Sequence, residues 1–487
     1  MKVRFLNSLL LLVVATVIVG CAHSRTVGNQ PNAAEVIHAV SDLSHEFSFY
    51  ADQRFHKQYL PNHKGVTNWC NLYNFDFSNA NLLLLFDCNE RIGYKQKDVE
   101  VINEFLSDGG GVVIFGTKEG QAQNQLLESF GATFSNMSEG ALTVSDRIAS
   151  NKIEGHVQST LEFSQPKKWE VLIADENNKA AMALKKVGKG NLLVASRGLA
   201  GSHPSARDSI NKELWRMLLP EIAGAKAVDS NKTFKGSGID KLEYLDDYGT
   251  FKLSYNDYLK PYAEAMVDVY KRSFPHIEKR MGVPLSPGMA SHITLLATGG
   301  GGFSSGKVVA LAVWWGGFPK KEDGMIEFLT HESVHSWVLP YPEVWNEPIA
   351  TYVGNLVMMD MGHEEEAKRR IKKTIERGLK YDPTMEIYDI NGHSNSSDNE
   401  LDNAAKNNIH WGKTYWIFEQ LRKENPDIIA DYFKKKRFYT ANNKINQYDM
   451  NNTVAVLSMA IGRDLFGWCN QYGLSVDKHK AEIKMEL

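Results

Sequence analysis

The segment Glu100–Gly116, EVINEFLSDGGGVVIFG, predicts an α/β unit in the first half of the chain. Apolar residues at positions 99, 102, 105 and 106 have the spacing of one helical face. Three glycines at 109–111 end that helix, and the apolar run 112–115 is typical of a strand buried on both faces. Leu82–Phe86 is an earlier run of the same kind. Strand, helix and strand in this order predict a parallel crossover unit.

Similar signals extend this α/β region to about residue 225. We expect further strands at 171–174, 181–184 and 192–195, and helices at 123–130 and near 208–218. The stretch 224–240 is small, polar and glycine-bearing, which is typical of a boundary. A chain of 487 residues is long enough for two to four domains. The predicted domains are 36–225 and 241–487, joined by a linker at 226–240.

The first 20 residues have the pattern of an export signal. Lys2 and Arg4 precede an apolar run that is too short to span a membrane comfortably. The ending Ile18-Val19-Gly20-Cys21 resembles the lipobox of bacterial lipoproteins, which implies cleavage before Cys21 and lipidation of its thiol. Residues 21–35 would then form a tether. Ala22 in place of Asp favours the outer over the inner membrane by the same resemblance; the alternative, an uncleaved anchor helix, also holds the chain at a membrane.

Charge and cysteine content exclude other classes of protein. The formal net charge of −3 gives no basic surface of the kind that nucleic acid binding needs. Four cysteines are too few for a disulfide scaffold, and their spacing leaves a Cys70–Cys88 bridge open.

The chemistry in this sequence is concentrated at Thr330–His335, THESVH, which contains the pattern H-E-x-x-H. On a helix, residues four apart share a face, so His331 and His335 can hold one zinc ion. Glu332 then projects beside the metal, where it can take a proton from water. The apolar positions of 325–338 predict a mostly buried helix ending before Pro340.

A second helix supplies the third ligand in this prediction. Asn346 suits an N-cap and Pro348 a first turn, so we expect Glu347 to open a helix running to about Met361. Glu347 would complete a His-His-Glu site with one open position. Glu343 is the alternative third ligand.

These motifs resemble the gluzincin branch of zinc metallopeptidases, in which H-E-x-x-H is followed by a helix bearing E-x-x-A/S. The resemblance implies an α+β zincin domain with a helical C-terminal part, His331, His335 and Glu347 as zinc ligands, and Glu332 as general base on zinc-bound water. Two departures are Pro348, where many relatives have glycine, and the short interval of eleven residues between His335 and Glu347. Enhancin-like, mucin-directed peptidases tolerate such intervals and are the nearest subfamily.

The N-terminal region resembles the class-I glutamine-amidotransferase-like fold, through EVINEFLSDGGGVVIFG and KKVGKGNLLVASRG. Enzymes of that fold carry a nucleophilic cysteine between glycines. Cys88 lies in the context Asp87-Cys88-Asn89-Glu90 with no glycine beside it. We therefore expect a buried or bridged cysteine and a non-catalytic support or recognition domain.

Other segments of the second domain suggest its remaining parts. We expect a helix at 255–281 and a strand at 293–297, and by resemblance to zincins an edge strand at Val308–Trp315 that pairs with substrate. Residues 361–379 predict a helix whose basic cluster is a solvated face, and 391–408 a loop. His410 stands where some gluzincin aminopeptidases have an oxyanion-stabilising tyrosine; the alternative is a plain surface histidine.

The sequence thus predicts a membrane-anchored zinc metallopeptidase of the bacterial cell envelope. Its substrates would be exported proteins, glycoproteins or wall peptides. The rival hypothesis is a non-catalytic, zincin-like lipoprotein that binds a protein or glycan partner.

Overall fold

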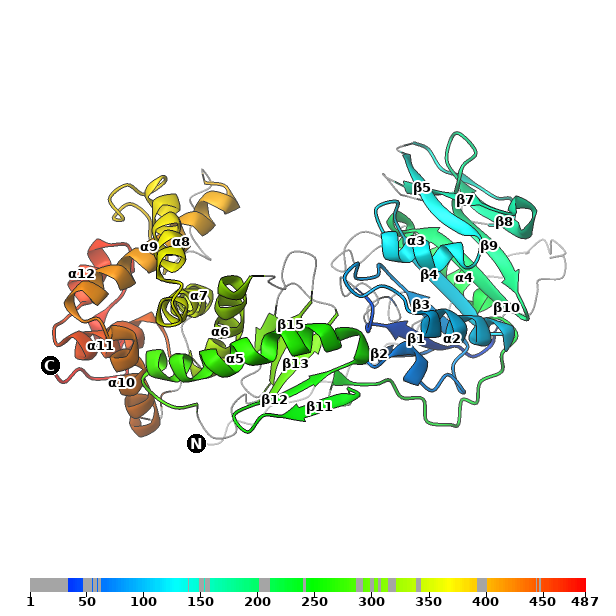
Figure 1. The fold of residues 1–487 in the computed structure, drawn as a ribbon. Helices are drawn as coiled ribbons and strands as arrows, with labels where there is room; N and C mark the ends of the chain where they lie inside the picture. Colours follow the sequence, from blue (N-terminus) through cyan, green and yellow to red (C-terminus); the bar gives the residue numbers. More distant parts are fainter. Residues whose placement is uncertain are drawn as a thin grey trace, which may run out of the picture.

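Two β-sheets organise the protein, one in each half of the chain (Figure 1). The computed structural model describes residues 34–487, apart from 47–54, 56–58, 60–62, 139, 149–152, 154–157, 201–210, 240–241, 286–291, 298–301, 305–307, 314–320, 339–342, 392–400, 444 and 446–447. The predicted signal 1–20, the lipidation site Cys21 and nearly all of the tether lie outside the described residues. No helix in the described part of the chain is long and apolar enough to cross a membrane.

The first sheet is mostly parallel on one side and antiparallel on the other. Its strands are β1 (His38–Asp42), β2 (Lys64–Asn68), β3 (Leu82–Leu85), β4 (Gly111–Gly116), β5 (Ala132–Ser138), β6 (Thr143–Val144), β7 (Gln158–Phe163), β8 (Trp169–Ala174), β9 (Ala180–Val187) and β10 (Gly190–Ser196). The main order is β2-β1-β3-β4-β10-β9-β7-β5. Neighbours from β2 to β10 are parallel, whereas β9, β7 and β5 add on antiparallel.

The crossover predicted from the glycine-rich segment is confirmed. α2 (Gln96–Ser107) connects the parallel strands β3 and β4. Two further α-helices of this half are α3 (Gln121–Glu128) and α4 (Lys212–Ala223). Gly111 is needed for close packing, because a Cβ there would lie 2.0 Å from the Ile222 carbonyl oxygen of α4. Separate apolar cores fill the two faces of the sheet.

The second sheet has an edge that the sequence did not predict. Its strands are β11 (Tyr244–Asp247), β12 (Lys252–Tyr255), β13 (His292–Leu296), β14 (Gly302–Ser304) and β15 (Val308–Ala312), in the order β11-β12-β13-β15-β14. The prediction of an edge strand at 308–315 is wrong, because β15 lies between β13 and the short antiparallel β14. Three residues in a glycine-rich segment carry no alternating apolar pattern, so β14 gives no strand signal.

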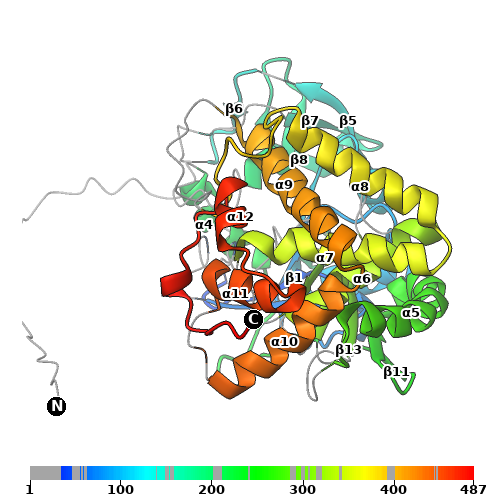
Figure 2. The same ribbon diagram turned by 90° about the vertical axis from the view of Figure 1, so that its left-hand side faces the viewer.

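Helices form most of the second half. They are α5 (Lys260–Met281), α6 (Glu322–Val338), α7 (Glu343–Asp360), α8 (Glu364–Leu379), α9 (Asn403–Glu424), α10 (Ile428–Asn443), α11 (Met450–Ile461) and α12 (Phe466–Gln471). The loop predicted at 391–408 is too long, since α9 begins at Asn403. The Asp402 side chain accepts a hydrogen bond from the Ala405 amide and caps that helix. Figure 2 shows α8 and α9 lying alongside each other over α7.

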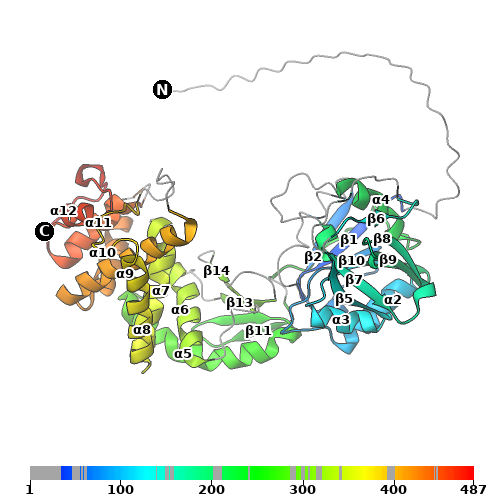
Figure 3. The same cartoon turned by 90° about the horizontal axis from the view of Figure 1, so that it is seen from above.

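Buried polar contacts join the two halves, which lie at opposite ends of the molecule in Figure 3. Asn89 donates its side-chain amide to the Ala297 carbonyl at 2.8 Å, just after β13. Tyr258 donates its hydroxyl to Asp98, and the Asp98 carboxylate also lies 3.3 Å from His45 Nε2. Burial lowers the pKa of His45, but Asp42 and Asp98 outweigh it and raise that pKa to about 9.

None of the three cysteines in the described chain is in a disulfide, and all three are buried. The Cys70–Cys88 bridge left open by the sequence is therefore not formed in the structure. Burial raises the pKa of the Cys88 thiol, and neighbouring carboxylates add to the effect. A buried thiol with a raised pKa is a poor nucleophile, in line with a structural role.

Substitution of Gly412 tests the crossing of α8 and α9. A Cβ on Gly412 would lie 2.6 Å from the Gly378 Cα, so Gly412→Ala must push the helices apart. We expect a loss of about 1–3 kcal/mol of unfolding free energy, measured by denaturant titration. Gly467→Ala in α12 is the matched control, because nothing lies within 4 Å of its Cβ position. It should be neutral or stabilise by about 0.5–1 kcal/mol. Equal effects would contradict this packing.

Candidate metal centre

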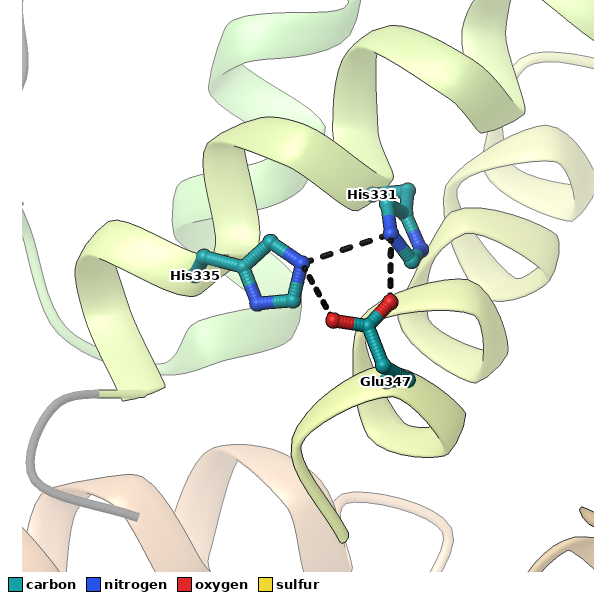
Figure 4. Close-up of side chains that lie close together, drawn as sticks. All are labelled: His331, His335 and Glu347. Carbon is teal, nitrogen blue, oxygen red and sulfur yellow. Dashed lines mark hydrogen bonds and ion pairs between the residues drawn. The ribbon is translucent and has the colours of Figure 1, made fainter. Parts of the chain in front are cut away.

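Three side chains from two adjacent helices converge on one point (Figure 4). His331 and His335 lie one turn apart on α6, and Glu347 lies in the second turn of α7. The two Nε2 atoms are 3.3 Å apart. The Glu347 carboxylate oxygens lie 3.2 Å from His331 Nε2 and 3.7 Å from His335 Nε2. This group could hold a metal ion.

The 3.3 Å between the two Nε2 atoms fits two ligands of one tetrahedral ion. Ligand bonds of about 2.0–2.1 Å at tetrahedral angles place neighbouring ligand atoms about 3.3 Å apart. Both histidines are largely buried, whereas the Glu347 side chain is 54% exposed. The centre is therefore walled by protein on the histidine side and open to solvent beside Glu347.

His335 is oriented by Asn346. Its Nδ1 lies 2.7 Å from Asn346 Oδ1, an acceptor, so Nδ1 carries the hydrogen and Nε2 presents a lone pair to the centre. The predicted N-cap role of Asn346 is wrong, because α7 begins three residues earlier at Glu343. An interior position on α7 turns the Asn346 amide toward α6 instead.

His331 is oriented in the same way by Thr351. Its Nδ1 lies 2.8 Å from Thr351 Oγ1, and that hydroxyl donates to the Glu347 carbonyl at 3.3 Å. Because the Thr351 hydroxyl hydrogen is donated to that carbonyl, its oxygen accepts a hydrogen bond from His331 Nδ1–H. The Nε2 lone pair of His331 therefore again points to the candidate centre. Such outer partners fix the tautomer of metal-binding histidines.

Glu332 is the buried carboxylate beside the group. Its Oε1 lies 3.9 Å from His331 Nε2, and the residue is 5% exposed. Burial raises the pKa of Glu332 to about 7; nearby Glu347 adds to this and His331 opposes it. A carboxylate whose pKa is near neutrality can both accept and return a proton.

The three candidate ligands also shift one another's pKa values. Burial lowers the pKa of His331, but the protonated imidazole gains a hydrogen bond from Nε2 to Glu347 and the attraction of nearby carboxylates, so the pKa is raised overall. Burial and the neighbouring His331 lower the pKa of His335. Hydrogen bonding to His331 lowers the pKa of Glu347. His335 and Glu347 are thus held in the deprotonated forms that bind metal.

The alternative third ligand, Glu343, forms the first residue of α7, and its side chain lies outside the described part of the chain. Glu347 lies with His331 and His335 in the group that could hold a metal ion, but it does so from inside a helix and not at its start.

His410 lies beside this turn of α7, and Pro348 explains why. Pro348 has no amide hydrogen, so it cannot bond to the carbonyl of Val344 four residues earlier. His410 of α9 supplies the missing donor, since its Nε2 hydrogen-bonds to the Val344 oxygen. The contact braces the turn that carries Glu347. An oxyanion role for His410 stays a prediction.

Two residues of the centre escaped sequence reasoning. Thr351 lies four residues after Glu347, and this spacing on a helix was the available signal. For Asn346 the sequence indicates only a preference for a helix N-cap. The residue type alone does not reveal that either side chain hydrogen-bonds to a histidine. That role becomes visible only once the packing of α6 against α7 is known.

Zinc affinity distinguishes the two candidate carboxylates. Glu347→Ala removes one of three convergent ligands and should weaken zinc binding by more than about 100-fold, exceeding the cost of losing an outer partner. Glu343→Ala should leave affinity within a few-fold. Competition with a chromophoric chelator measures both, and the reverse ranking would assign the site to Glu343.

A double substitution tests the role of His410. His410→Ala leaves the Val344 carbonyl unpaired at a cost of about 1–3 kcal/mol, and should weaken zinc binding. Pro348→Ala restores an amide donor to that carbonyl, so His410→Ala should have a much smaller effect in this background. An equal loss of turnover in both backgrounds, with zinc affinity unchanged, would instead favour the oxyanion role.

Comparisons with known proteins add similarity to part of the chain only. No protein-family model matches the chain, and no curated protein is significantly similar to it. Solved structures that match include the N-terminal domain of IFT52, with 15% identity and TM-score 0.32, covering 39% of this chain and 99% of that one. A cytoplasmic protein of Salmonella typhimurium matches at 10% identity and TM-score 0.29, covering 39% and 100%. A β-galactosidase from Bacillus circulans sp. alkalophilus matches at 12% and 0.26, covering 39% and 31%. Scores this low carry no argument about function.

Proposed function

We propose that this protein is a zinc-dependent peptidase of the gluzincin type. The observation that carries the proposal is the convergence of His331, His335 and Glu347 within 4.8 Å of one another, with buried Glu332 beside them. Two imidazole nitrogens, one carboxylate and an open side are the donor set of catalytic zinc sites. The hydrogen bonds to Thr351 and Asn346 support it, because they leave both Nε2 lone pairs available.

Zinc bound there would polarise a substrate carbonyl and lower the pKa of water. Glu332 would act as general base and then as general acid. Its raised pKa suits it to accept a proton from water and to return it to the departing amine. The exposed side beside Glu347 gives the substrate access.

The edge strand β14 supports an extended peptide as substrate. In the described chain β14 pairs only with β15, and α6 lies against it. A free strand edge that lies against the helix carrying His331 and His335 can bind peptide backbone through main-chain hydrogen bonds. Exported proteins, glycoproteins and wall peptides are the substrate classes we propose.

The remaining parts of the proposal concern location and the first half. Lipidation at Cys21 would hold the protein at the envelope, with the outer membrane favoured. The amidotransferase-like half would be a support or recognition domain, since Cys88 is buried and hydrogen bonds from Asn89 link it to the second sheet.

Removal of Glu332 tests catalysis. Glu332→Ala should lower peptide cleavage by at least about 100-fold while zinc affinity changes little, because the carboxylate moves protons and is not a ligand. Cleavage is measured with a mixed peptide library and mass spectrometry. Glu365→Gln, an exposed carboxylate on α8, is the control and should retain activity.

Two outcomes would contradict the peptidase proposal. Equal cleavage by the parent protein and Glu332→Ala would place catalysis elsewhere. Zinc binding without any cleavage would favour the rival, a lipoprotein that uses the same centre to bind a protein or glycan partner.

A further inference from the structure

A cavity of about 330 Å³ lies next to the metal centre, between α7, α8 and α9. These helices lie side by side in Figure 2. Its floor includes Thr351 and Tyr415, and its wall includes Lys373, Arg377 and Trp411. None of these residues belongs to the proposed ligand set or to the proton-transfer machinery.

Residues that line the cavity lie on the same two helices as the candidate ligands, about one turn away from them. On α7, Glu347, Thr351 and Asn355 follow one another at intervals of four, and the last two line the cavity. On α6, Glu327 also lines it, one turn before His331. One helical turn is about 5–6 Å long, so the cavity begins about one turn from the ligands. Thr351 belongs to both, because it hydrogen-bonds His331 and faces the cavity.

Part of the positive charge of this cavity is already neutralised. Arg370 pairs with Glu327 at 2.7 Å, Asp323 at 2.8 Å and Glu366 at 2.8 Å. Arg369 also pairs with Glu366. The expectation that the whole basic cluster of α8 is a solvated face is therefore wrong for Arg370, which binds the carboxylates of α6.

Two cations of the cavity wall have no such partner. Lys373 and Arg377 are one turn apart on α8, and neither forms an ion pair with any carboxylate that the structure describes. Their neighbour Lys372, by contrast, does not line the cavity and pairs with Glu376. Trp411 of α9 lines the same cavity and is only partly buried. Two cations without a carboxylate partner and an aromatic ring in one cavity suit an anion on an apolar stem.

We infer that this cavity binds a carboxylate carried by the substrate. The inference rests on the proposed function, because it treats the metal centre as the place where the scissile bond lies. Lys373 and Arg377 would donate charge-assisted hydrogen bonds to the carboxylate, and Trp411 would cover its stem. Because the cavity begins about one helical turn from the ligands, and extended peptide spans about 3.3 Å per residue, the carboxylate would lie at least about two residues from the scissile bond. Either an acidic side chain or a chain terminus supplies this chemistry.

Peptide binding tests the inference without requiring hydrolysis. The protein is the full chain with Glu332→Ala, loaded with zinc, and calorimetry measures affinity. Three sets of N-acetylated pentapeptides are compared, which differ only in the position of a negative charge. The first is neutral with glutamine and a C-terminal amide; the second moves one glutamate through the five positions and keeps the amide; the third has glutamine and a free carboxylate.

We expect one acidic peptide to bind at least about 10-fold more tightly than the neutral peptide. The second and third sets then identify the source as side chain or terminus. Lys373→Gln with Arg377→Gln should abolish this preference, whereas Lys372→Gln on the same helix should preserve it. Zinc content and circular dichroism verify that each variant is folded and loaded.

Equal binding of acidic and neutral peptides by the Glu332→Ala protein would overturn the inference. A preference for acidic peptide that survives the added substitution of Lys373 and Arg377 would also overturn it. These results are distinct from failure of the proposed function. If the protein with Glu332 intact cleaves no peptide but the charge preference depends on Lys373 and Arg377, the anion site stands and the peptidase proposal falls.

Discussion

The candidate centre depends on two hydrogen bonds that α6 makes to α7. His331 and His335 each use Nδ1 to contact a side chain of α7, Thr351 and Asn346 respectively. These contacts fix both tautomers, and they set the rotation of α7 that brings Glu347 to the two Nε2 atoms. Without this pairing the H-E-x-x-H motif would present two histidines on a helix but no third ligand. The arrangement of the three candidate ligands and the docking of the two helices thus depend on the same contacts.

The short interval between His335 and Glu347 is accommodated by the early start of α7. Only four residues separate the end of α6 from Glu343, and α7 is already one turn long when it reaches Glu347. The helix then continues through Pro348, with His410 bonded to the carbonyl that the proline leaves free. Capping preferences favour a helix that opens at Glu347 with Asn346 as its N-cap, because they describe an isolated chain. Packing against α6 and α9 stabilises the longer helix. Rules based on local sequence do not take this packing into account.

Much of the centre was predictable. Helical periodicity alone places His331 and His335 on one face of a helix. Around the start of the next predicted helix, only Glu343 and Glu347 are available as a third ligand. The same periodicity predicted α2, α5 and the buried strands β3 and β4. The edge strand β14 and the outer partners were not predictable, since strand pairing and contacts between helices depend on residues distant in sequence. Local pattern does not record which face of α7 meets α6.

Anomalous scattering from crystals grown with zinc tests the central claim most directly. We predict one strong zinc peak within about 2.0–2.2 Å of His331 Nε2, His335 Nε2 and a Glu347 carboxylate oxygen, with a remaining position open to solvent. A peak bonded through Nδ1 of either histidine, a site that lacks Glu347, or no peak at these residues would contradict the account.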